Sequence, residues 1–87
     1  MSYNVFWADK KVQKTFDHLS PLVQERITSA IKELTSNPRP SGIKKLSGKL
    51  TDVWRIRIGD FRLLYEIDDK SRKVILLDLG HRRHIYR

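Results

Sequence analysis

Two patterns of hydrophobic residues divide this chain into helical and extended segments. Apolar side chains recur at helical spacing over residues 9–19 and again over 23–34, and Ser20-Pro21 between them is a typical helix start. Prolines at 38 and 40 stop the second stretch. Residues 3–7 form a short aromatic and β-branched run. The pattern therefore predicts a first strand followed by a helical hairpin.

The segment from residue 53 to 67 predicts a β-hairpin with two chemically different faces. A two-residue turn at Gly59-Asp60 sets Arg57 opposite Arg62. One face is then apolar, with Trp54, Ile56, Ile58, Leu63 and Tyr65. The other face carries Arg55, Arg57 and Arg62. Two arginines that face each other cost stability unless an anion lies between them, and a phosphate backbone would supply that anion.

The third strand of the predicted meander covers residues 73–79, after a turn at 68–71. Residues 74–77 are apolar on both faces, so we expect this strand in the interior of the sheet. The predicted fold class is α+β. A single domain spans 1–87, in which the N-terminal strand, the α-helical hairpin and a three-stranded antiparallel meander complete one antiparallel sheet. The apolar face of the hairpin should pack on the two helices.

Charge supports an anionic partner. The chain has 18 Lys and Arg against 10 Asp and Glu, a net charge of +8, and most of the excess lies after residue 40. The connector over 42–50 offers Lys44, Lys45 and Lys49 as RNA-binding candidates, although a solvated connector is an equal alternative. Cysteines are absent and no apolar run is long enough for a membrane span, so we expect a cytoplasmic protein without a membrane partner.

The last eight residues bring acid/base candidates to the basic half of the chain. His81, His84 and Tyr86 can exchange protons, and the arginines between them can hold phosphate. A frayed tail is the plain alternative, but a tail folded back over the arginines is the stronger expectation. The two histidines have no nearby ligand pair, so neither a metal nor another cofactor is predicted.

Acidic residues have minor roles in this interpretation. Asp60, Glu66 and Asp78 show no paired-carboxylate pattern. Glu66 has the same parity as Arg62 along the strand, and we expect the two side chains to form a salt bridge.

Three motifs together resemble the RelE/ParE toxin superfamily and, within it, the RelE-like ribonuclease branch. They are Lys45-Leu-Ser-Gly48, Trp54-Arg-Ile-Arg-Ile-Gly-Asp-Phe-Arg-Leu-Leu-Tyr65 and Gly80-His-Arg-Arg-His-Ile-Tyr86. The order of elements matches as well. The resemblance implies the toxin of a type II toxin–antitoxin system: a metal-independent mRNA endonuclease that acts in the ribosomal A site and so inhibits translation. It also implies a cognate antitoxin, with the toxin monomeric when free and hetero-oligomeric in the complex.

The resemblance also implies site residues. Catalytic positions of the family correspond to Arg55, Arg57, Arg62, Arg82 and Tyr86, and Arg83 lies beside them as an RNA-binding candidate. Well-known members have lysines where this chain has Arg55 and Arg57. Arginine stays protonated and cannot act as a general base, so proton removal from the RNA 2′-OH nucleophile falls to Tyr86, His81 or His84.

Two other classes remain as alternatives. A ParE-like toxin would share the fold but inhibit gyrase by protein contact, without need for the arginine, histidine and tyrosine set. A non-catalytic RNA or DNA binder would use the helical hairpin, whose net charge is low for that task.

Overall fold

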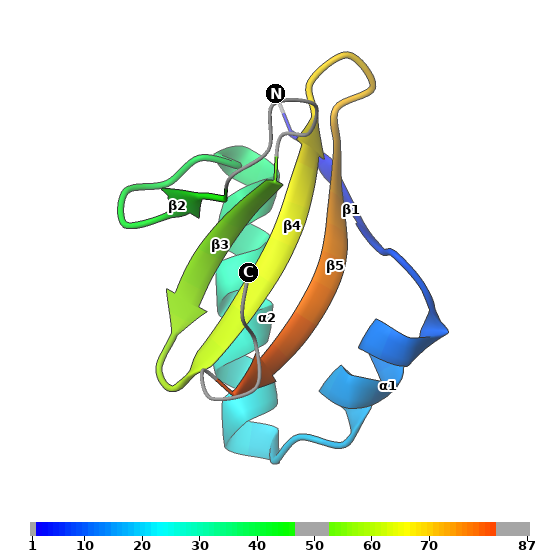
Figure 1. The fold of residues 1–87 in the computed structure, drawn as a ribbon, viewed down its shortest axis with the longest axis vertical. Coiled ribbons are helices and arrows are strands. Elements are labelled where there is room, and N and C mark those ends of the chain that lie inside the picture. Colours follow the sequence, from blue (N-terminus) through cyan, green and yellow to red (C-terminus); the bar gives the residue numbers. More distant parts are fainter. Residues whose placement is uncertain (1, 47–52, 82–87) are drawn as a thin grey trace.

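A five-stranded sheet with two helices on one side forms the fold (Figure 1). The computed structural model describes residues 2–46 and 53–81. In chain order the elements are β1 (Asn4–Trp7), α1 (Lys10–Asp17), α2 (Pro21–Ser36), β2 (Lys44–Lys45), β3 (Val53–Ile58), β4 (Phe61–Asp68) and β5 (Lys73–His81). Five of the predicted site residues lie outside the described residues: Lys49, Arg82, Arg83, His84 and Tyr86.

Both helices begin where the sequence predicts, because a side chain caps each start. The Asp9 carboxylate accepts a hydrogen bond from the Val12 backbone N–H at 3.0 Å, and the Ser20 hydroxyl accepts one from Val23 N–H at 3.4 Å. Pro21 occupies the first turn of α2, where its missing N–H costs nothing. The predicted helical hairpin is therefore confirmed.

Gln24 of α2 joins the two helices of this hairpin. Its side-chain amide donates to the backbone carbonyls of Phe16 and Asp17, at 2.9 and 3.2 Å. These carbonyls belong to the last turn of α1, whose acceptors have no partner within the helix. One side chain thus completes the end of α1 and fixes the angle at which α2 leaves it.

The strand order is β1-β5-β4-β3-β2. β3, β4 and β5 form the predicted antiparallel meander, and β5 lies in the interior as expected. The sheet as a whole is mixed, because β1 pairs parallel with β5. β2 is a fifth strand inside the connector, and its two residues were too few to produce a pattern in the sequence. The chain between β1 and β5 contains both helices and three further strands, which is far more than the long connection that a parallel pair requires.

The hydrophobic core lies between the sheet and the helices. Its buried members are Val12, Ile27, Leu34, Leu63, Tyr65, Ile67, Val74, Leu76 and Leu79. Trp54, Ile56 and Ile58 pack against this cluster, so the apolar face of the predicted hairpin does lie on the helices. Tyr65 is fully buried, and its hydroxyl donates to the Pro38 carbonyl oxygen at 2.9 Å, which satisfies the polar end of the ring.

The β3–β4 turn has the geometry that the sequence requires. Gly59 adopts a φ of +61°, in the left-handed region that glycine enters without steric cost. This two-residue connection fixes the predicted register, in which Ile58 pairs with Phe61 and Arg57 with Arg62. Because the turn sets the register, every side chain of β3 and β4 is assigned to its face.

A β-bulge interrupts the pairing of β4 with β5. The register passes from Leu64 opposite Asp78 to Tyr65 opposite Leu76, which leaves Leu77 as the extra residue of β5. Leu76 and Leu79 consequently both face the helices, although they are three residues apart. The bulge thus reverses the alternation of side chains in the last part of β5.

Across the part of the chain that the structure describes, neither helix combines the length and the apolar character that spanning a membrane demands.

Candidate functional site

The predicted arginines come together on the side of the sheet that the helices leave uncovered. We call this surface, with Arg55, Arg57 and Arg62, the arginine face. Arg57 is exposed and directly opposite Arg62, whereas Arg55 is half-buried and opposite Leu64. Arg62 is half-buried too, and its Nε atom is shielded from solvent. Three permanently charged guanidinium groups therefore lie within two adjacent strands.

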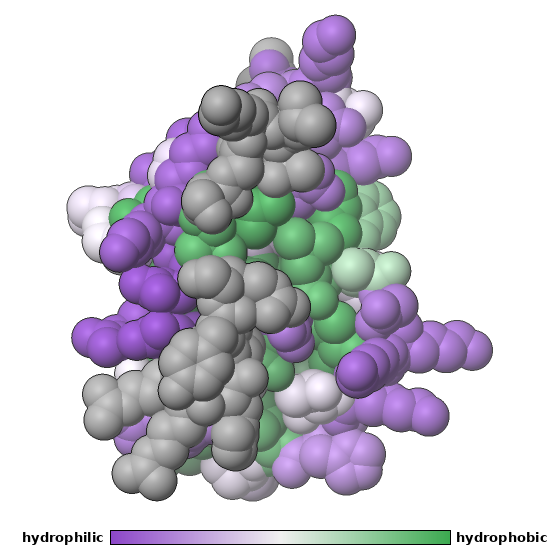
Figure 2. Space-filling model, in the orientation of Figure 1, coloured by the Kyte–Doolittle hydropathy of each residue, from purple (hydrophilic) through white to green (hydrophobic). Residues whose placement is uncertain are grey.

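Hydrophobic residues form the middle of the same surface. Figure 2 shows them reaching the surface along the centre of the sheet, with hydrophilic residues on both sides. Leu64 of β4 belongs to this side by register but is buried, and Ile75 of β5 is half-buried. Phe6 pairs with Ile75 across β1 and β5 and is 46% exposed. The face thus combines fixed positive charge at β3 and β4 with an apolar strip along β4, β5 and β1.

The two described lysines of the connector lie on opposite sides of the sheet. Lys44 pairs with Arg55 and therefore belongs to the arginine face. Lys45 pairs with Trp54, and its ammonium lies 5.7 Å from the centre of the indole ring. Of these two RNA-binding candidates, the structure brings only Lys44 to the arginines.

The bulge in β5 decides which titratable groups of that strand share a side with the arginines. Asp78 pairs with Leu64 and so lies on the arginine face, where its carboxylate accepts a hydrogen bond from Leu79 N–H at 2.9 Å. His81 pairs with Phe61 on the other side, and the two rings meet edge to face with centroids 5.8 Å apart. Phe61 packs on the core. The His81 imidazole is therefore separated from the guanidinium groups by the sheet.

Sequence reasoning did not find this placement of Asp78. Plain alternation from Val74, which faces the core, would put Asp78 on the helix side and His81 with the arginines. The available signal was Leu76-Leu77, two apolar residues in succession just before the acidic one. Such a break in alternation is typical of a bulge but is also compatible with a strand buried on both faces, which was our interpretation.

The expected salt bridge between Glu66 and Arg62 is wrong. Both side chains lie on the arginine face, but Glu66 pairs with Val53 and Arg62 with Arg57. Residues four apart along a strand are separated by roughly 13 Å, too far for an ion pair. Among the described residues, no ion pair joins these two side chains.

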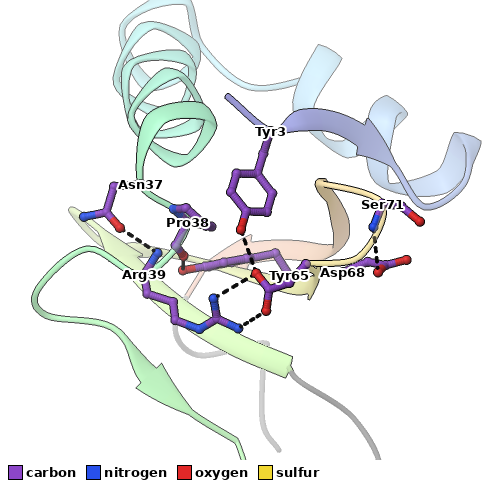
Figure 3. Close-up of polar contacts among 8 residues, drawn as sticks. Tyr3, Asn37, Pro38, Arg39, Tyr65, Asp68 and Ser71 are labelled. Atoms are coloured by element: carbon purple, nitrogen blue, oxygen red, sulfur yellow. Dashed lines mark hydrogen bonds and ion pairs between the residues drawn. The ribbon is translucent and has the colours of Figure 1, made fainter. Parts of the chain in front are cut away.

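A second polar cluster lies at the β4–β5 turn, at the other end of β4 from the Gly59 turn (Figure 3). We call Tyr3, Arg39 and Asp69 the Asp69 clasp. The two terminal nitrogens of Arg39 donate to the two carboxylate oxygens of Asp69, at 3.2 and 3.0 Å, and the Tyr3 hydroxyl donates to Asp69 Oδ1 at 2.6 Å. These contacts connect the residue that precedes β1, the loop after α2 and the β4–β5 turn.

The clasp changes the proton affinities of its members. The hydrogen bonds from Arg39 and then from Tyr3 lower the pKa of the Asp69 carboxyl. The bond to Asp69 in turn raises the pKa of the Tyr3 hydroxyl, because that bond requires the neutral phenol as donor. Both groups are solvent-exposed, so the clasp is a structural tie rather than a buried acid/base pair.

The arginine face is suited to anions. In residues 2–46 and 53–81, no three His, Cys, Asp or Glu side chains are grouped as metal ligands. Guanidinium groups instead present forks of N–H donors that match phosphate oxygens, and their charge is independent of pH in the physiological range. This arrangement can bind an RNA backbone and stabilise negative charge that develops at phosphorus.

Comparison with known proteins agrees with this geometry. The family described as the ParE toxin of the type II toxin–antitoxin system parDE matches residues 8–86. RelE1 of Methanocaldococcus jannaschii is 32% identical over 90 residues, which covers all of this chain and 98% of that protein. Toxin RelG of Mycobacterium tuberculosis is 40% identical over 58 residues, covering 67% of this chain and 66% of RelG.

Solved structures show the same fold. The archaeal RelE–RelB complex from Pyrococcus horikoshii OT3 contains a chain with a TM-score of 0.85 and 28% identity, covering 98% of this chain and all of the other. The toxin–antitoxin complex RelBE2 of Mycobacterium tuberculosis contains one with a TM-score of 0.77 and 27% identity, covering 93% and 99%. From its sequence match and its fold, this chain belongs to the RelE/ParE superfamily and is a RelE-like toxin of a type II toxin–antitoxin system.

Proposed function

We propose that this toxin is a ribosome-dependent mRNA endonuclease that uses the RNA 2′-OH as its nucleophile. The observation that carries the proposal is the arginine face, where Arg57 and Arg62 are directly opposite each other on the side of the sheet away from α1 and α2. Such a pair is unfavourable alone and favourable around a phosphate. The resemblance of the motifs to RelE-like ribonucleases supplies the reaction and the ribosomal A site.

The chemistry needs little more than position and charge. The 2′-OH attacks the adjacent phosphorus, the bond to the 5′-oxygen breaks, and that oxygen leaves with a proton. The products are a 2′,3′-cyclic phosphate and a 5′-hydroxyl. Arg55, Arg57 and Arg62 hold the phosphate and stabilise the extra negative charge of the pentavalent transition state, where each well-placed donor contributes about 3 kcal/mol.

Proton transfer requires groups other than these arginines, since guanidinium remains protonated. His81 lies across the sheet from the arginine face, so the proposal gives it no part in the reaction. Tyr86 and His84 carry this role in our proposal, with Arg82 adding charge and Arg83 and Lys49 contacting the RNA. These five residues belong to the part of the chain outside the described residues.

A cognate antitoxin is the proposed protein partner in the cytoplasm. Relatives of this fold were solved as complexes of RelE with RelB, which supports the same partnership here. We expect the toxin to be monomeric when free and to form a hetero-oligomer in the complex. An antitoxin that covers the arginine face would need acidic side chains for Arg55, Arg57 and Arg62 and apolar ones for the strip along β5.

Expression tests this proposal in cells. The toxin alone should arrest growth, and co-expression of its cognate antitoxin should restore growth. The matched control is toxin with Arg62→Ala, which should be tolerated without the antitoxin. Harmless expression of the unaltered toxin would contradict the proposal.

Purified components test the chemistry. In a translation reaction, the toxin should cut mRNA that occupies ribosomes and leave the same mRNA intact when ribosomes are omitted. A 2′-O-methyl group at the cleaved nucleotide should abolish cutting, because it removes the nucleophile. Cleavage that survives this substitution would exclude the 2′-OH mechanism.

One observation favours a second candidate. The family that matches residues 8–86 is described as ParE, and a ParE-like toxin would inhibit gyrase by protein contact. A supercoiling assay separates the two functions, because inhibition of gyrase together with intact translated mRNA would favour the ParE-like activity.

A further inference from the structure

Two adjacent lysines of β2 have different surroundings because a strand alternates its side chains. β2 pairs antiparallel with β3, with Lys44 opposite Arg55 and Lys45 opposite Trp54. The Leu46 N–H donates to the Val53 carbonyl at 3.0 Å and continues this ladder by one residue. Cross-strand partners lie on the same face, so Lys44 extends the arginine face beyond β3 while Lys45 lies on the helix side.

Lys45 makes a contact that holds β2 in this register. Its ammonium and the Arg39 guanidinium each lie 5.7 Å from the centre of the Trp54 ring. Trp54 itself packs against the core. A slip of β2 by one residue would take Lys45 away from the indole and turn Lys44 to the helix side.

The Asp69 clasp supports the other cation at Trp54. Arg39 donates hydrogen bonds to both carboxylate oxygens of Asp69, and Tyr3, the residue before β1, donates to the same carboxylate (Figure 3). A chain of contacts thus runs from Tyr3 through Asp69 and Arg39 to the ring of Trp54. It holds in place the indole that Lys45 of β2 contacts.

We propose that Lys44 is a further RNA-backbone contact of this toxin and that Lys45 is a positioning residue that keeps Lys44 beside Arg55. The inference rests on the proposed RNA-cleaving function and adds the path that the RNA backbone takes over the protein surface beyond the arginine face. Lys44 is exposed, it is the next cation after Arg55 across the sheet, and its strand is aligned by two independent contacts, the β2–β3 ladder and the Lys45–Trp54 contact. The backbone therefore extends from Arg62 and Arg57 across Arg55 toward β2.

Binding of a single-stranded RNA oligonucleotide with 2′-O-methyl groups, which cannot be cut, tests this at several salt concentrations. Each phosphate contact contributes about 0.7 to the slope of log K against log salt for single strands. Lys44→Ala should reduce the slope by that amount, and Lys44→Arg should restore it. Lys32→Ala removes the same charge from an exposed position of α2, so it is the matched control and should keep the slope. Lys45→Ala should lose part of the slope, because the β2–β3 ladder alone then holds Lys44 beside Arg55, and Lys45→Arg, which keeps a cation at Trp54, should restore it.

Three results would overturn the inference. Lys44→Ala could keep the slope of the unaltered toxin, Lys45→Ala could keep that slope as well, or Lys32→Ala could lose as much slope as Lys44→Ala. Arg62→Ala in the same titration separates this from the proposed function. If Arg62→Ala weakens binding and Lys44→Ala does not, the role of Lys44 is wrong and the arginine face stands. If neither variant matters and translated mRNA stays intact, the proposed function fails as well.

Discussion

Arg57 of β3 and Arg62 of β4 are direct cross-strand partners on the side of the sheet opposite α1 and α2. Like charges in this relation destabilise a sheet by roughly the amount that opposite charges would stabilise it, a few tenths to about 1 kcal/mol. The two-residue turn at Gly59 fixes the register of β3 and β4, so the strands cannot shift to separate these two arginines. The toxin therefore keeps two positive charges together at a small cost in stability, where a phosphate can neutralise them.

Arg62→Ala should reduce cleavage roughly 100-fold or more, the loss expected when a donor worth about 3 kcal/mol in the transition state is removed. The free energy of unfolding should change by less than about 1 kcal/mol, because the substitution also relieves repulsion by Arg57. Single-turnover cleavage of ribosome-bound mRNA and chemical denaturation measure the two quantities.

Arg26→Ala is the control for this substitution. Arg26 is an exposed arginine of α2 whose guanidinium reaches the β3–β4 turn beside Gly59, so the variant loses the same charge near the hairpin but from outside the arginine face. Its cleavage rate should stay near that of the unaltered toxin. Equal rates for Arg62→Ala and the unaltered toxin would remove the arginine face from the mechanism.

Tyr86→Phe deletes only a hydroxyl and should lower the rate at saturating ribosomes while leaving RNA binding nearly unchanged. His81→Ala should cleave at almost the normal rate, because the imidazole lies beside Phe61 on the other side of the sheet. His84→Ala should be milder than Tyr86→Phe. The measurement is the cleavage rate against pH for each variant.

A different pattern would reassign the proton transfer. If Tyr86→Phe cleaves normally while His84→Ala abolishes activity and flattens the pH dependence near neutrality, histidine is the acid or base. Loss of activity in His81→Ala with an intact fold would show that the tail of the strand changes its side when RNA binds.

Stability should depend on pH through the Asp69 clasp. The folded-state pKa of Asp69 is lowered, so its contribution is present above the unfolded pKa near 4 and is lost as pH falls through the folded value. The pKa of Tyr3 is raised, so its contribution is present below about pH 10 and is lost as pH rises through the folded value. Melting temperatures from pH 2 to 11 should therefore fall at both ends.

Asp69→Asn removes the carboxylate that both partners require, so the melting temperature should be lower at neutral pH and flatter at both extremes. Asp68→Asn is a neighbouring control in the same turn, since the Asp68 carboxylate accepts a local hydrogen bond from Ser71 N–H at 3.2 Å. Identical pH profiles for the two variants would contradict the role of the clasp.

Tyr65→Phe should lower the free energy of unfolding by about 1 to 3 kcal/mol, because the buried Pro38 carbonyl loses its donor. For a domain of this size, each kilocalorie shifts the melting temperature by about 4 to 8 °C. The ring remains, so cleavage measured well below the transition should be unchanged. A large loss of activity without loss of stability would show that Tyr65 has a role beyond packing.

The parts of this fold that the sequence predicts correctly are those controlled by neighbouring residues. The helix starts follow from Asp9 and Ser20-Pro21, and the hairpin register follows from Gly59, because each signal lies next to the structure that it controls. Arg57 and Arg62 each lie two residues from the Gly59-Asp60 turn, and the turn therefore places them opposite each other. The arginine face is therefore predictable from local signals in the amino-acid sequence alone.

Features that depend on distant partners were not predictable in this way. β2 is a strand only because β3 is beside it, and the Asp69 clasp joins residues that are 66 and 30 positions apart in sequence. The expected Glu66–Arg62 salt bridge failed because parity along a strand gives the face of a residue and not its distance. The sides taken by Asp78 and His81 depended on a bulge that alternation alone does not reveal.

That single extra residue in β5 has a consequence for how such toxins can diversify. Every position after Leu77 takes its side of the sheet from the bulge, so a regular ladder that included Leu77 would exchange the chemistry of both surfaces at the end of the strand. Asp78 would turn toward the helices and His81 toward the arginine face. Substitutions that remove the bulge without changing the length of β5 would therefore give this scaffold a different set of reactive groups, while the core residues before the bulge keep their places.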